Sequence, residues 1–77
     1  MVKIKPIEKI VMRQVRGSLE AFLDGKKNLN WIKGTIRNSG ALYYKGMLKE
    51  IFDGLRRYKT LPRYNEILEE CKKEKWL

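Results

Sequence analysis

The residues of this chain that are best suited to chemistry are cations, and most of them lie in two segments without acidic residues. The first segment, here called the basic window, runs from Gly25 to Lys49 and contains Lys26, Lys27, Lys33, Arg37, Lys45 and Lys49. The second segment, the arginine cluster, contains Arg56, Arg57, Lys59 and Arg63. Lysine and arginine neutralise phosphates, and arginine binds them with two parallel hydrogen bonds. The pattern therefore predicts contact with the phosphate backbone of DNA or RNA.

Aromatic residues are interleaved with both sets of cations, and aromatic rings stack on unpaired bases. We expect Trp31 and Tyr43, in the basic window, to be exposed and available for stacking. Tyr44, Tyr58 and Tyr64 fall on the apolar stripes of predicted helices, so we expect them to pack in the core.

Few residues of this chain are suited to catalysis. The chain has no histidine and one cysteine, which excludes imidazole acid–base catalysis, Ser–His and Cys–His nucleophiles and any ordinary zinc site. Glu66, Glu69 and Glu70 precede three lysines on one predicted helix, a pattern typical of an ion-paired exposed face. No glycine-rich phosphate loop is present. We predict a protein that is not an enzyme, with no catalytic residue, metal or cofactor.

Length and composition indicate one small domain, residues 1–77, with a net charge of +9. The lone Cys71 rules out an internal disulfide and favours an intracellular, cytoplasmic setting, and we expect its thiol to be buried on a helix. No apolar run is long enough to span a membrane. Because so short a chain has a small core, a homodimer or docking in a larger assembly would help to complete it.

Helical periodicity is clear at both ends of the chain. Three- and four-residue steps predict a helix over 6–24, which Gly25 ends in a left-handed conformation. Its predicted inner stripe consists of Ile7, Ile10, Val11, Val15, Leu19, Phe22 and Leu23. A last helix is predicted over 61–75, with Thr60 as its cap and Pro62 in its first turn.

The middle of the chain is compatible with two structures. The first has helices over 29–38 and 41–59. It is favoured by an unbroken stripe at three- and four-residue steps, made of Ala41, Tyr44, Leu48, Ile51, Leu55 and Tyr58. The second is a β-hairpin over about 31–45, since Trp, Ile, Thr and Tyr are good strand residues. Two helices around Gly40 would also have the layout of a helix-turn-helix, although the apolar positions fit that motif poorly.

The sequence thus predicts an all-α fold, a compact bundle of three or four helices. An α+β fold with the central hairpin is the alternative. Apolar and basic residues alternate over Met1–Lys5, which fits either a short strand or a frayed terminus, and the frayed terminus is favoured.

Three functions fit this sequence. The first is non-catalytic nucleic-acid binding through phosphate contacts, with little base readout. The second is an accessory subunit or adaptor in a larger protein or nucleoprotein assembly, which the apolar stripes and the terminal Trp76 and Leu77 favour. The third is binding to an anionic membrane surface by a basic amphipathic helix. Charge gathered on one face favours nucleic acid or lipid, whereas dispersed charge with an exposed apolar groove favours the adaptor.

Overall fold

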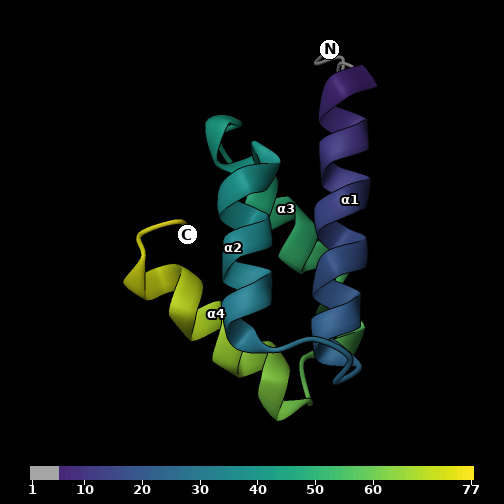
Figure 1. Cartoon of the computed structure of the whole chain (residues 1–77), viewed down its shortest axis with the longest axis vertical. Helices are drawn as coiled ribbons and strands as arrows, with labels where there is room; N and C mark the ends of the chain where they lie inside the picture. Colours follow the sequence, from purple (N-terminus) through teal and green to yellow (C-terminus); the bar gives the residue numbers. More distant parts are fainter. Residues whose placement is uncertain (1–5) are drawn as a thin grey trace.

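The computed structural model describes residues 6–77, which form four α-helices and two single turns of 3-10 helix (Figure 1). The helices are α1 (Pro6–Leu23), α2 (Leu29–Ser39), α3 (Met47–Gly54) and α4 (Pro62–Lys73), and the 3-10 turns are η1 (Ala41–Tyr43) and η2 (Arg56–Tyr58). No strand occurs in this part of the chain. The predicted all-α bundle is therefore confirmed, and the alternative hairpin over 31–45 is wrong. The expectation for Met1–Lys5 lies outside the described residues.

The end of α1 is fixed by a Schellman motif, so α2 turns back antiparallel beside it (Figure 1). Gly25 has a φ of +82°, and its N–H donates to the Phe22 carbonyl at 3.0 Å. The N–H of Lys26 donates to the Ala21 carbonyl at 2.9 Å. Glycine adopts this left-handed conformation without a steric penalty, which confirms the predicted helix stop.

Both ends of α2 are also capped. The Asn28 side chain accepts a hydrogen bond from the Trp31 N–H at 2.8 Å, as an N-cap does. Gly40, with a φ of +87°, ends the helix, and the Ser39 hydroxyl accepts a hydrogen bond from the Ala41 N–H at 3.1 Å. The following α-helix begins only at Met47, so the Gly40 turn does not join two α-helices as a helix-turn-helix does.

The predicted helix over 41–59 is wrong as a continuous element, because it is divided into η1, α3 and η2. Gly46 interrupts it with a φ of +80°, which no right-handed helix contains. A second break lies at Leu55, between α3 and η2. Most of the apolar stripe is nevertheless buried: Ala41, Leu48, Ile51 and Leu55 are at most 3% exposed, while Tyr44 and Tyr58 are half-buried against the core. Helical and 3-10 turns both advance by three to four residues, so the spacing predicted burial correctly without predicting continuity.

The core is centred on α1, which contacts the three other α-helices and η1. Val15, Leu19 and Phe22 are completely buried. The predicted inward orientation of Ile7 and Ile10 is wrong, because these residues are 53% and 51% exposed. The 18-residue α1 is about 27 Å long and α2 about 16 Å, so the first turns of α1 extend past its neighbour (Figure 1).

The last helix, α4, crosses the end of the bundle at which α1 finishes (Figure 1). Pro62 lies in its first turn, as predicted. The N-cap is Leu61, which makes no side-chain capping bond, so the prediction of Thr60 as the cap is wrong. Over the described residues, no helix has the length and apolar character needed to cross a membrane.

Truncating the α3 stripe should unfold the domain. Leu48 and Ile51 are 3% and 2% exposed, so changing either to alanine should cost about 2–5 kcal/mol of unfolding free energy. Urea titration followed by circular dichroism measures this loss. Tyr43→Ala is the matched control, because Tyr43 is 90% exposed and its loss should change stability by less than about 0.5 kcal/mol. Parent-like midpoints for both core variants would contradict the assignment of α3 to the core.

Candidate nucleic-acid interface

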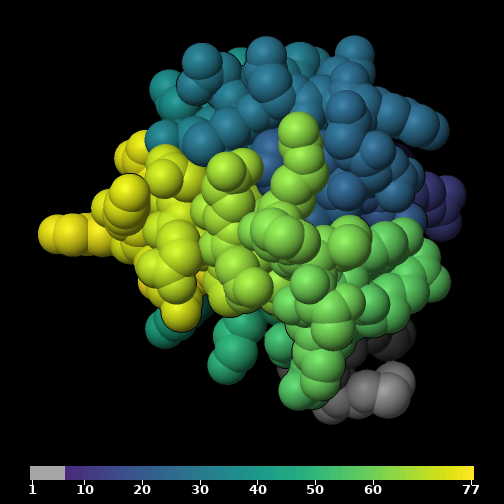
Figure 2. Space-filling view, turned by 90° about the horizontal axis from the view of Figure 1, so that it is seen from below, coloured from purple at the N-terminus to yellow at the C-terminus, as the bar shows by residue number. Residues whose placement is uncertain are grey.

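The fold divides the basic window between two ends of the molecule. Lys26 and Lys27 precede α2 while Lys45 and Lys49 follow it, and the helix between them is about 16 Å long. The loop before α2 lies beside η2 and the start of α4, as the view from below shows (Figure 2). One end of the molecule therefore joins part of the basic window to the arginine cluster. We call it the basic end and define it as Lys26, Lys27, Arg56, Arg57, Lys59 and Arg63.

Arg63 connects the two segments that form the basic end. Its Nη1 donates to the Phe22 carbonyl in the last turn of α1 and to the Lys27 carbonyl in the following loop, each at 3.0 Å. Its guanidinium carbon lies 4.8 Å from the centroid of the Phe22 ring, in a cation–π contact. A cation at this position also complements the negative end of the α1 dipole. These contacts hold the loop against the first turn of α4.

An exposed aromatic ring adjoins this end. Trp31 is in the first turn of α2 and is 37% exposed, which confirms its predicted exposure. The Lys27 ammonium nitrogen lies 5.2 Å from the centroid of its ring. A cation is therefore placed over the face of a partly exposed aromatic ring.

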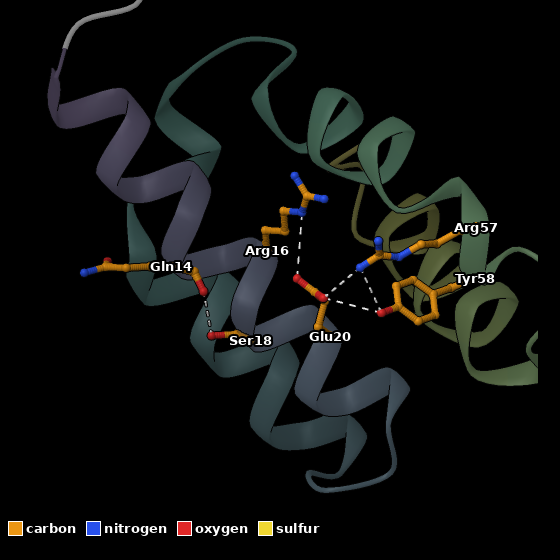
Figure 3. A network of polar contacts seen from close by, with 6 residues as sticks. All are labelled: Gln14, Arg16, Ser18, Glu20, Arg57 and Tyr58. Carbon is orange, nitrogen blue, oxygen red and sulfur yellow. Dashed lines mark hydrogen bonds and ion pairs between the residues drawn. The ribbon is translucent and has the colours of Figure 1, made fainter.

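The arginine cluster is joined to α1 through Glu20 (Figure 3). Arg57 Nη2 donates to Glu20 Oε2 at 3.3 Å and to the Tyr58 hydroxyl at 3.2 Å, and Arg16 Nε lies 3.7 Å from Glu20 Oε1. The positive charge of Arg57 is therefore partly compensated. Arg56, one residue earlier, is exposed and has no ion-pair partner among the described residues.

Lys33 has a structural partner on another helix. Its ammonium nitrogen lies 3.0 Å from Glu70 Oε1 and 3.0 Å from Glu74 Oε2, so it ties α2 to α4. The hydrogen bond to Glu70, followed by that to Glu74, raises the pKa of Lys33. The hydrogen bonds from Lys33 and then Lys73 lower the pKa of Glu70. The Lys33 charge is thus shared with two carboxylates.

The remaining predicted site residues lie away from the basic end. Arg37 is in the last turn of α2, and Tyr43 is on η1 beyond it, with the predicted exposure. Lys45 and Lys49 lie beside an apolar groove between α3 and α4. The fold therefore does not bring these four residues to the basic end.

Two further predictions about side chains are confirmed. Cys71 is completely buried, and burial raises the pKa of its thiol to about 12, so it is protonated and unreactive at neutral pH. Two of the three predicted carboxylates of α4 are ion-paired with lysines one turn later, Glu69 with Lys72 at 3.9 Å and Glu70 with Lys73 at 3.4 Å, while Glu66 has no such partner among the described residues. Among residues 6–77 there is no group of three potential metal ligands.

Two features of these surfaces escape sequence reasoning. The acceptors of Arg63 are backbone carbonyls, which leave no signal in the amino-acid sequence. Lys72 and Lys75 have the spacing of an ion-paired helix face, yet they also line the apolar groove. Their proximity to Trp76 and Leu77 in the chain is the one signal that points to this second role.

Comparison with known protein families, with curated proteins and with solved structures found no match to this chain.

Replacing Lys33 should reveal its pairing through the pH dependence of stability. The pKa of Glu70 is lowered in the folded state, so its ionised carboxylate stabilises the fold. This stabilisation is fully present above the ordinary pKa of 4.5 and is lost as the pH falls through the folded-state pKa. The Lys33→Gln variant should therefore have a lower melting temperature than the parent at neutral pH. The difference between the two melting temperatures should become smaller at acid pH. Thermal melts at a series of pH values measure it.

Lys26→Gln is the matched control, since Lys26 has no ion-pair partner among the described residues. It should melt like the parent at every pH. A Lys33→Gln gap that stays constant down to acid pH would contradict the pairing.

Proposed function

We propose that this protein is a non-catalytic nucleic-acid-binding protein that contacts phosphates with its basic end. The observation that carries the proposal is the pair of hydrogen bonds from Arg63 to the Phe22 and Lys27 carbonyls. They hold cations from two distant segments at one end of the bundle. The two segments together place more cations at that end than either segment does alone.

The cations of the basic end are suited to phosphates. Lys26, Lys27, Arg56 and Lys59 are exposed and have no carboxylate within ion-pairing distance among the described residues. Glu20, on the adjacent face of α1, is occupied by Arg57 and Arg16. Binding a phosphate backbone would release its condensed counterions, which is the main source of affinity for such a surface.

The proposed mode of binding is sequence-tolerant. The basic end is built from a loop, a 3-10 turn and one helix start, and such a surface offers no helix to lay along the major groove. Phosphate contacts would position the nucleic acid, and the exposed Trp31 ring would stack on an unpaired base. The proposal includes both DNA and RNA as ligands. We also propose an intracellular location, which the buried free thiol of Cys71 supports.

The accessory-subunit hypothesis is supported by a different surface. An apolar groove lies at the other end of α2, away from the basic end. The two hypotheses therefore concern separate residues and are testable separately.

A reciprocal pair of charge variants tests the nucleic-acid proposal. In the first, Lys26, Lys27, Arg56 and Lys59 are changed to glutamine. In the second, the four groove lysines Lys45, Lys49, Lys72 and Lys75 are changed to glutamine, which removes equal charge elsewhere. All eight residues are exposed, so both variants should fold. Fluorescence anisotropy with a labelled single strand and a labelled duplex, over a range of salt, measures binding.

The basic-end variant should bind at least about tenfold more weakly at low salt. The slope of the logarithm of its affinity against the logarithm of the salt concentration should become shallower by about one unit for each lost phosphate contact. The groove variant should keep most of the parental affinity. Parental binding that is absent at low salt, or indifferent to salt, would refute the proposal. Equal losses in both variants would refute its location.

A further inference from the structure

A groove of about 750 Å³ separates η1 and α3 from the C-terminal half of α4. Its apolar lining includes Leu42, Tyr44, Leu48, Leu68, Trp76 and Leu77. Leu42 is 38% exposed and Leu77 is 41% exposed, so part of this apolar surface faces solvent. The volume lies within the range of about 300–1,000 Å³ typical of ligand pockets.

The C-terminal wall of the groove is held in place by the backbone. Lys75 has a φ of +63°, and the Trp76 N–H donates to the Cys71 carbonyl at 2.9 Å. The Lys75 N–H donates to the Lys72 carbonyl at 3.0 Å, which completes a Schellman motif. Residues other than glycine rarely adopt this left-handed conformation, and beyond it Trp76 packs against the core. Trp76 therefore forms a fixed side of the groove.

The rim of the groove carries four lysines, of which Lys72 also forms an exposed ion pair with Glu69 at 3.9 Å. Lys45 and Lys49 lie on one side and Lys72 and Lys75 on the other, all four exposed. Asp53 is the one acidic residue of the lining. An occupant that complements this groove is apolar along its centre and acidic along both edges.

We infer that this groove binds an acidic amphipathic helix of a partner protein. Apolar side chains of that helix, one turn apart, would enter the floor, and its flanking aspartates and glutamates would pair with the lysine rim. A nucleic acid would leave the apolar floor without a partner, and a flat lipid surface does not enter a recess between two helices. The inference shares no residue with the basic end, so it stands independently of the nucleic-acid proposal.

A selection from a random peptide library displayed on phage tests this inference. The full-length protein serves as bait, and peptides that also bind the variant with Lys45, Lys49, Lys72 and Lys75 changed to glutamine are removed. The selected peptides should be rich in Asp and Glu, with apolar residues at i, i+3 or i+4, and i+7. Synthetic versions should bind the parent in anisotropy measurements, and the rim variant should bind them at least about tenfold more weakly.

The basic-end variant is the matched control, because it loses the same charge and should bind the selected peptides like the parent. In a Trp31→Phe variant, the remaining Trp76 lines the groove, so tryptophan fluorescence measures binding there. The emission of Trp76 should change when a peptide binds.

Several results would overturn the inference. One is a selection that yields no peptide dependent on the rim lysines, or peptides without the acidic, helical pattern. Another is preferential binding of the parent to phosphatidylserine vesicles, lost in the rim variant, which would make the groove a membrane contact. A third is a dimer in sedimentation that dissociates in the rim variant, since a second copy would then occupy the groove.

Discussion

The structure depends on the burial of one apolar stripe along α1, from Val11 to Leu23, against which the other helices pack. A chain with a single cysteine has no disulfide to supplement that burial, so its small margin of stability rests on this contact. Phe22 links the core to the surface. Its ring is completely buried under the Arg63 guanidinium, while its carbonyl accepts hydrogen bonds from Gly25 and Arg63. The packing that stabilises α1 therefore also positions the basic end.

The net charge of +9 is divided into parts with different roles. Lys33 and Arg57 connect helices through Glu70 and Glu20, and Arg63 satisfies backbone carbonyls. Among residues 6–77, the exposed cations without an ion-pair partner include Lys26, Lys27, Arg56 and Lys59 at the basic end and Lys45, Lys49 and Lys75 beside the apolar groove. The molecule thus has both features that separated the sequence hypotheses, a concentration of charge and an exposed groove, on different surfaces. The two proposed binding surfaces therefore share no residue.

Local sequence signals predicted the stop of α1 at Gly25 and most of the buried stripe, but they failed for the Thr60 cap and for Ile7 and Ile10. The stop at Gly25 was predictable because the preference of glycine for a left-handed conformation is a property of the residue itself. The break at Gly46 was missed, since a stripe of buried residues has nearly the same spacing in separate turns as in one helix. The exposure of Ile10 depends on the length of α2 beside it. For the site, the sequence shows which residues are cations, but only the folded structure shows which of these cations form ion pairs.

The central claim is that the basic end is the surface that meets nucleic acid, and backbone NMR of the isotopically labelled protein tests it most directly. A short oligonucleotide is added at low salt, and shifts of the amide resonances are followed residue by residue. We expect shifts concentrated in residues 24–31 and 56–63, and added salt should reverse them. Shifts centred on residues 42–49 and 72–77 would contradict the account, and so would a spectrum that the oligonucleotide leaves unchanged.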